Sequence, residues 1–135
     1  MKTIFITGTS SGIGRATVRH FSSNGWRVVA TMRNPNKETE MQHWPNVVLK
    51  PLDVTQQDSI EHAIAETIKE FGQIDVLVNN AGYGAIGIFE ASTPEQIQRQ
   101  FDTNVFGLMN VIRAILPHFR GRVNGTIINV TSIGG

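Results

Sequence analysis

Short apolar runs alternate with longer stretches of mixed polarity along the chain. The apolar runs are rich in β-branched side chains and most are bounded by Gly, Pro or Asn, which is typical of strands. Their hydrophobicity is nearly continuous rather than alternating, so it predicts strands that are covered on both faces, as in a parallel sheet. The five predicted strands occupy residues 3–7, 27–31, 47–49, 74–78 and 126–130.

The stretches between these runs show helical periodicity. Apolar residues recur three or four positions apart from Ile60 to Phe71, and the pattern stops at Gly72, so it predicts a helix with one face on a sheet. A further helix is predicted from about Asn104 to Phe119. Its apolar positions cover more than one face, which indicates contact with the sheet and with another surface, such as a second subunit.

Strands separated by helices of this length predict right-handed βαβ units. We therefore expect an α/β fold, a doubly wound parallel sheet of the Rossmann type, with residues 1–135 as one domain. Loops are expected at residues 33–45 and 81–94, which hold Pro, Gly and polar residues. In such a sheet the carboxyl ends of the strands border one crevice, where ligands bind.

Composition and charge narrow the function classes. A chain of 135 residues, 40% hydrophobic, can build a core without disulfides. The absence of cysteine excludes cysteine nucleophiles and Cys-ligated metal sites, and it fits a reducing compartment. Lys and Arg number 12 against 11 Asp and Glu, with four scattered histidines, so we expect no nucleic-acid or membrane partner and no metal site. No secretion signal or spanning segment is recognised, so the expected location is cytoplasmic.

The most informative motif is the glycine-rich turn at residues 7–14, directly after the first strand. Glycines let the chain turn tightly and let the backbone approach a pyrophosphate, while free N–H groups of a helix beginning near Arg15 hold negative charge. An ordinary glycine-rich turn is the alternative, but the position between a strand and a helix favours dinucleotide binding. The predicted cofactor-binding residues of this turn are Gly8, Thr9, Ser10, Ser11, Gly12, Ile13 and Gly14.

The turn and four further motifs together resemble the short-chain dehydrogenase/reductase family, and the resemblance covers the whole chain. The motifs are Thr-Gly-x-x-x-Gly-x-Gly in the turn, Asp53 after the third strand, Asn79-Asn80-Ala81-Gly82 after the fourth, Asn104 in Asp102–Gly107, and Asn129–Gly135 at the end of the fifth. The resemblance implies an enzyme that interconverts a small-molecule alcohol and a ketone or aldehyde. Hydride would be exchanged with a nicotinamide cofactor.

The resemblance also implies roles for individual residues. Asp53 would hydrogen-bond the adenine with Val54 beside it, although a loop cap is the simpler role for this aspartate. Asn104 would kink its helix and hold a water for proton relay, and Ser132 would be the catalytic serine that bonds the substrate oxygen; a helix-start asparagine and a turn serine are the alternatives. Asn79 would tie the central strand to its neighbour. Ala81 and Gly82 are expected near the cofactor ribose, and Asn80 is a further predicted cofactor-binding residue.

The end of the second strand indicates which dinucleotide binds. NAD enzymes commonly place an acid there to bond the ribose 2′-hydroxyl, but this chain has Met32 and Arg33. Arg33 can pair with a 2′-phosphate, so we expect NADP, with NAD as the alternative if Arg33 is only a solvated loop charge. Ser11 weakens the case slightly, because NADP members of the family often have a basic residue at that position.

The resemblance is incomplete at the catalytic acid. The family's Tyr-x-x-x-Lys pair is absent, and the single tyrosine, Tyr83, is expected to line the cofactor side. We therefore expect an amino-terminal portion of a larger, homo-oligomeric reductase, a dimer or tetramer, with its sheet truncated after the fifth strand. Alone it would show little or no turnover. The alternative is a non-catalytic dinucleotide-binding or assembly module.

Overall fold

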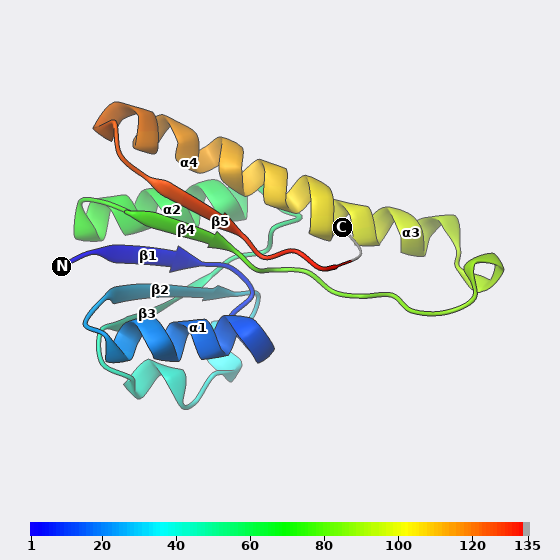
Figure 1. The fold of residues 1–135 in the computed structure, drawn as a ribbon, viewed down its shortest axis with the longest axis horizontal. Helices are drawn as coiled ribbons and strands as arrows, with labels where there is room; N and C mark the ends of the chain where they lie inside the picture. The colour runs from blue at the N-terminus through cyan, green and yellow to red at the C-terminus, as the bar shows by residue number, and fades with distance from the viewer. Residues whose placement is uncertain (134–135) are drawn as a thin grey trace.

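A computed structural model describes residues 1–133 and is built around a parallel five-stranded sheet (Figure 1). The strands are β1 (Thr3–Ile6), β2 (Arg27–Met32), β3 (Val47–Pro51), β4 (Val76–Asn79) and β5 (Thr126–Asn129). Their order is β3-β2-β1-β4-β5, with every neighbouring pair parallel. This confirms the predicted doubly wound sheet and places its switch point between β1 and β4. Gly134 and Gly135, which end the fifth sequence motif, lie outside the described residues.

Helices cover both faces of the sheet (Figure 1). One face packs on α1 (Gly12–Ser23), and the other packs on α2 (Gln57–Phe71) and α4 (Leu108–Arg122). Alternate residues of β1 contribute to opposite sides, with Ile4 in one buried cluster and Phe5 in the other, because side chains alternate along a strand. Burial on both faces explains why the strands read as unbroken apolar runs.

The connections contain short helical turns that the sequence pattern did not predict. The loop after β2 holds η1 (Pro35–Lys37) and η2 (Met41–His43), and the loop after β4 holds η3 (Phe89–Ala91). The first helix begins at Gly12 rather than near Arg15, because Arg15 N already donates a hydrogen bond to the carbonyl oxygen of the N-cap Ser11 at 3.2 Å.

The helical region before β5 begins earlier than the predicted start at Asn104. An additional helix, α3 (Pro94–Phe101), continues through a π-helical segment, η4 (Asp102–Gly107), into α4. A capping box opens α3: Thr93 Oγ1 accepts a hydrogen bond from Gln96 N at 3.1 Å, and Gln96 Oε1 accepts one from Thr93 N at 2.9 Å. The prediction missed α3 because most of its residues are polar.

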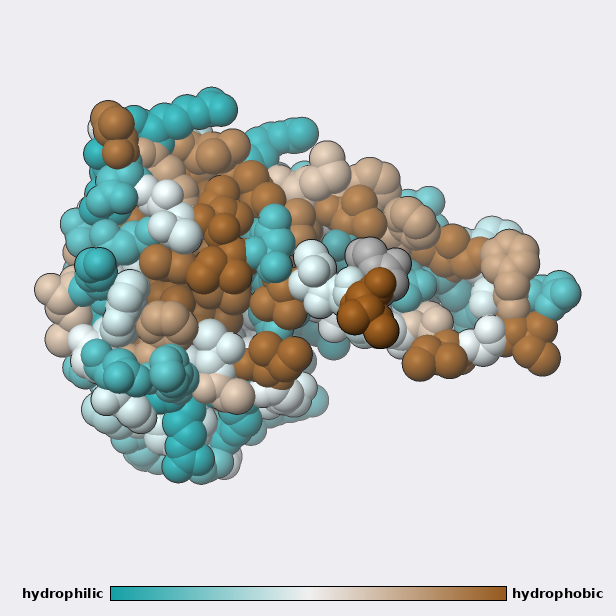
Figure 2. Space-filling view, in the orientation of Figure 1, coloured by the Kyte–Doolittle hydropathy of each residue, from teal (hydrophilic) through white to brown (hydrophobic). Residues whose placement is uncertain are grey.

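The predicted second apolar surface of this helical region is present. Val111, Ile115 and Phe119 face the sheet and are buried, whereas hydrophobic side chains before them stay exposed. The exposed residues along α3, η4 and α4 are Phe101, Val105, Phe106 and Met109. Figure 2 shows further hydrophobic surface over β5 and on the projecting segment between β4 and α3. Within residues 1–133, no helix has both the length and the hydrophobicity to cross a membrane.

Candidate functional site

The turn between β1 and α1 is held by hydrogen bonds to the neighbouring strands. Thr7 Oγ1 accepts hydrogen bonds from the N–H groups of Asn80 and Ala81, each at 3.0 Å. Thr9 Oγ1 donates to the carbonyl oxygen of Thr31 at 3.0 Å. Both threonines are buried, so the turn is fixed to the ends of β2 and β4 rather than free to move.

Close packing around this turn explains two of its glycines. Gly8 has a φ of +66°, and a Cβ there would lie 2.7 Å from Ala81 Cα. A Cβ on Gly14 would lie 2.2 Å from Gly8 O and 2.5 Å from Asn80 Nδ2. Any side chain at either position would force α1 or the segment after β4 to move, because real Cβ contacts are never this short.

The amino terminus of α1 is open to an anion. Its N-cap, Ser11, makes no side-chain capping hydrogen bond, and the first turn carries no acidic residue. The first N–H groups of a helix lack partners within the helix and carry partial positive charge. Gly12 has a φ of +55° with open space where a Cβ would be, so the backbone is accessible there. These groups fit a phosphate.

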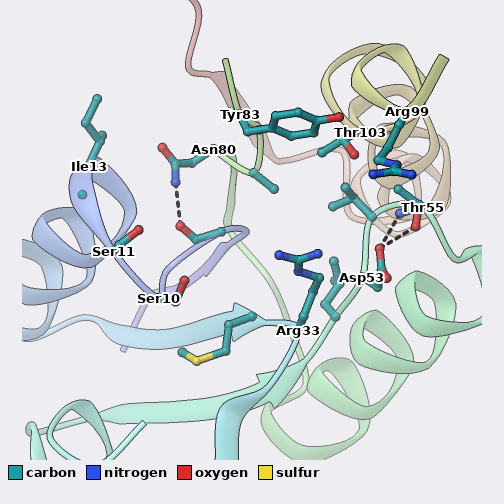
Figure 3. A pocket seen from close by; sticks show the side chains of 17 residues that line it. Ser10, Ser11, Ile13, Arg33, Asp53, Thr55, Asn80, Tyr83, Arg99 and Thr103 are labelled. Carbon is teal, nitrogen blue, oxygen red and sulfur yellow. Dashed lines mark hydrogen bonds between the residues drawn. The ribbon is translucent and has the colours of Figure 1, made fainter. Parts of the chain in front are cut away.

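This terminus forms one wall of a cleft of about 870 Å³ (Figure 3), a volume within the usual range for small-molecule sites. The cleft lies where β1, β2, β3 and β4 end, at the switch point of the sheet. Its lining residues are Gly8, Ser10, Ser11, Gly12, Ile13, Met32, Arg33, Leu52, Asp53, Val54, Thr55, Asn80, Ala81, Gly82, Tyr83, Arg99 and Thr103.

All the predicted cofactor-binding residues except Thr9 and Gly14 line this cleft. Thr9 is buried against Thr31, and Gly14 packs behind the turn, so both shape the turn rather than the surface of the cleft. Asn80 lines the cleft and also supports the turn, since its side-chain amide donates a hydrogen bond to Gly8 O at 2.8 Å. The segments predicted from the sequence thus meet at one cleft, while Thr9 and Gly14 support the turn behind it.

Asp53 lines the cleft and also caps its own loop. Its Oδ1 accepts hydrogen bonds from Thr55 N at 2.9 Å and from Thr55 Oγ1 at 2.7 Å (Figure 3). The loop-cap role considered for this residue is thus present. The loop cap uses only Oδ1 of Asp53, which leaves Oδ2 for a ligand contact.

The first acidic residue after β2 is Glu38, and both oxygens of its carboxylate already accept hydrogen bonds within the protein. Its Oε1 accepts hydrogen bonds from the N–H groups of Glu40 and Met41, each at 2.8 Å, and its Oε2 accepts one from Arg15 Nη1 at 2.6 Å. The Met41 N–H, followed by the Arg15 guanidinium, lowers the pKa of Glu38 to about 2. The carboxylate is therefore charged but bound to Arg15, and Arg33 is left as the charged residue of the cleft next to β2.

The two candidate catalytic residues lie in different surroundings. Asn104 sits in η4 and is half-buried; its Oδ1 accepts a hydrogen bond from Tyr83 N at 3.0 Å, and its Nδ2 donates to Tyr83 O at 2.7 Å. The helix is irregular at this asparagine, as the resemblance implied. Ser132 follows β5, is exposed, and does not line the cleft.

The expected tie at Asn79 is confirmed. Its Nδ2 donates a hydrogen bond to Asn129 Oδ1 at 3.0 Å, which joins β4 to β5 at their carboxyl ends. Asn79 is buried, so this polar pair fixes the register of the two strands.

Three polar residues that line the cleft were not predicted from the sequence: Thr55, Arg99 and Thr103. Arg99 comes from α3, away from the recognised motifs, whereas Thr103 comes from η4 and lies inside the Asp102–Gly107 motif, where only Asn104 was predicted as a site residue. The spacing Thr93-x-x-Gln96, a capping-box pattern, was the signal that could have revealed α3 and hence Arg99. Tyr83 lines the cleft as expected. Among residues 1–133, no three His, Asp or Glu side chains gather as metal ligands would.

Comparison with known protein families adds an independent finding. A family model described as short chain dehydrogenase matches residues 2–135. The 3-ketodihydrosphingosine reductase of Bacteroides thetaiotaomicron is 41% identical over 132 residues, which cover 98% of this chain and 47% of the relative.

Solved structures agree with this match. A short-chain dehydrogenase from Streptomyces avermitilis superimposes with a TM-score of 0.93 at 34% identity, covering 99% of this chain and 51% of that one. The protein ElxO, solved with NADP bound, superimposes with a TM-score of 0.86 at 29% identity, covering 98% of this chain and 56% of that one. The chain thus spans about half the length of the proteins it matches.

Proposed function

The chain belongs to the short-chain dehydrogenase family, and from that premise we propose that the protein is an NADP(H)-dependent oxidoreductase that interconverts an alcohol and a ketone or aldehyde. The observation that carries the cofactor assignment is the charge at the end of β2. Arg33 lines the cleft, whereas Glu38, the first acid after that strand, is held by Arg15. A guanidinium favours a 2′-phosphate, and the absence of a free carboxylate removes the usual partner of an unmodified ribose.

The residues of the cleft fit the parts of such a dinucleotide. The open N–H groups at the start of α1, with Ser11 beside them, would hold the pyrophosphate. Arg33 would pair with the 2′-phosphate, and Asp53 would accept a hydrogen bond from the adenine amino group. When bound, the nicotinamide supplies a hydride to a carbonyl carbon or accepts one from an alcohol.

The chain's own residues would position substrate and cofactor. Asn104 fixes the backbone of Tyr83 through two hydrogen bonds, which keeps that side of the cleft in place. Ser132 would donate a hydrogen bond to the substrate oxygen. We assign the proton donor to a residue outside these 135, because Tyr83 has Gly87 rather than a lysine four positions later, and a tyrosine needs a neighbouring cation to donate a proton near neutral pH.

The remaining proposals concern the setting of the enzyme. The protein would act on a small-molecule carbonyl or alcohol in the cytoplasm, without nucleic-acid or membrane partners. The exposed apolar surface of Phe101, Val105, Phe106 and Met109 would be covered by a second subunit in a homo-oligomer, a dimer or tetramer.

Steady-state assays with the natural protein test this proposal. NADPH oxidation is followed with a panel of ketones and aldehydes, and NADPH and NADH titrations are compared for wild type and Arg33→Glu. Arg113→Glu, on exposed α4 outside the cleft, is the matched control for charge. We expect Arg33→Glu to weaken NADPH by more than about tenfold and NADH much less, since a charge-assisted hydrogen bond contributes about 1.5–3 kcal/mol.

Each outcome separates the alternatives. Equal losses for the two dinucleotides would refute the NADP assignment. Tight NADPH binding without turnover of any carbonyl would refute the assignment as an enzyme and favour a non-catalytic dinucleotide-binding module.

A further inference from the structure

Three charged side chains line the cleft, and one of them has no role in the function proposed above. They are Arg33, Asp53 and Arg99. Arg33 reaches the cleft from the end of β2, whereas Arg99 reaches it from α3 on another side, beside Thr55 and Thr103 (Figure 3). Two guanidinium groups against one carboxylate leave the cleft with a net positive charge.

The guanidinium of Arg99 is available to a ligand. Among residues 1–133, no carboxylate forms an ion pair with Arg99, whereas Arg15 and Arg122 each have acidic partners. Arg99 is exposed and its side chain lies at the cleft. It can therefore contact a ligand without first giving up an internal partner.

The element that carries Arg99 is fixed in place. The Thr93–Gln96 capping box closes the amino end of α3, and Asn104 anchors the following segment to Tyr83 at 2.7 and 3.0 Å. Gln100, next to Arg99, also donates to Tyr83 O at 3.5 Å. These contacts join the carboxyl-terminal end of α3 to the segment after β4, so Arg99 is presented from a capped helix rather than from a loop.

The position of Arg99 in the cleft indicates which part of the dinucleotide it would contact. In a doubly wound fold the pyrophosphate lies at the start of the first helix and the ribose at the end of the second strand, here α1 and Arg33. The base then points toward the end of β3, where Asp53 lies. Arg99 is beside Asp53 and Thr55 and on the opposite side of the cleft from Ser11 (Figure 3), so it lies at the base rather than at the phosphates.

We propose that Arg99 is a binding residue for the adenine base, packing its guanidinium plane on the face of the ring while Asp53 contacts the ring edge. This inference rests on the dinucleotide site proposed above. A planar guanidinium stacks on aromatic faces better than an ammonium does. The contact would be shared by NADPH and NADH, unlike that of Arg33, because both cofactors carry the same adenine.

Titrations of the natural protein with NADPH, NADH, 5′-AMP and nicotinamide mononucleotide test the role of Arg99. The variants are Arg99→Gln and Arg99→Lys, with Arg113→Gln as the control for loss of an exposed charge, and Tm is measured for each. We expect Arg99→Gln to weaken NADPH, NADH and 5′-AMP by the same factor, on the order of 3- to 30-fold. Nicotinamide mononucleotide should be unaffected. Arg99→Lys should recover only part of the loss.

Three results would overturn the inference. The first is unchanged binding of all ligands to Arg99→Gln at an unchanged Tm. The second is a loss confined to NADPH, which would make Arg99 a phosphate contact, and the third is full recovery by Arg99→Lys, which would reduce its role to charge. A wild-type protein that bound neither dinucleotide nor 5′-AMP would overturn the proposed function together with this inference, so the two failures are distinguishable.

Discussion

The pair formed by Arg15 and Glu38 should be a main source of stability for the loop after β2. Glu38 is almost fully buried, with 8% of its side chain exposed, and it joins α1 to that loop. It also accepts two backbone N–H groups at the start of η2. Replacing it by glutamine keeps the size of the side chain but removes the charge, so Glu38→Gln isolates the electrostatic part of these contacts.

The magnitude follows from the pKa of Glu38, which falls from 4.5 to about 2 in the folded protein. A shift of this size corresponds to about 3 kcal/mol. Arg15 is 28% exposed, so solvent screening lowers the figure, and we expect Glu38→Gln to reduce the free energy of unfolding by about 1–3 kcal/mol at pH 7. Because the folded pKa is depressed, this stability is complete above pH 4.5 and is lost as pH falls toward 2.

The free energy of unfolding is measured by urea denaturation at several values of pH between 7 and 3, with circular dichroism as the signal. Glu40→Gln is the matched control, since Glu40 binds the same arginine but is 62% exposed; its loss should cost under about 0.5 kcal/mol. The difference between wild type and Glu38→Gln should shrink as pH falls below 4.5. Equal effects of the two variants, or a difference that does not change with pH, would show that the buried charge of Glu38 does not provide this stability.

Three further predictions concern the turn, η4 and α4. Gly14→Ala should lower the free energy of unfolding by about 3 kcal/mol, because the new Cβ would lie 2.2 Å from Gly8 O; an unchanged Tm would contradict this. Asn104→Ala removes both hydrogen bonds to Tyr83 and should cost about 1–2 kcal/mol and speed proteolysis of residues 83–93, unlike the exposed control Asn36→Ala. His118 Nε2 accepts a hydrogen bond from Ile74 N at 3.1 Å, and burial, aided by the Arg122 charge, lowers the pKa of His118. The free energy of unfolding should therefore fall as pH drops below about 6.5, where the unfolded chain takes up the proton. His118→Gln should reduce this dependence on pH, whereas the control His62→Gln, at an exposed position, should not.

The sheet was predictable because each strand is buried on both faces. A continuous apolar run such as the one around Phe5 must be covered on both faces, and such a run can be recognised from a few consecutive residues. The cleft followed from the same logic, since the glycines of the β1–α1 turn and the polar residues after β4 mark strand ends that meet at one edge.

Contacts between distant segments could not be predicted. Helix α3 has apolar residues only at Ile97 and Phe101 besides its terminal proline, which is too few for periodicity to identify a helix, and Arg99 was missed with it. The pairing of Arg15 with Glu38 joins residues 23 positions apart, and no spacing rule connects them. Sequence pattern thus located the backbone of the site, whereas the charged side chains that complete it needed the three-dimensional arrangement.

Hydrogen–deuterium exchange of the natural protein with and without NADPH is the most direct test of whether NADPH binds in the cleft between the β1–α1 turn and the ends of β2, β3 and β4. We expect slower exchange at residues 8–14, 31–33, 52–55 and 80–83, with the far end of α4 around His118 unchanged. Protection confined to the exposed apolar surface of α3, η4 and α4, or no protection at saturating NADPH, would contradict it.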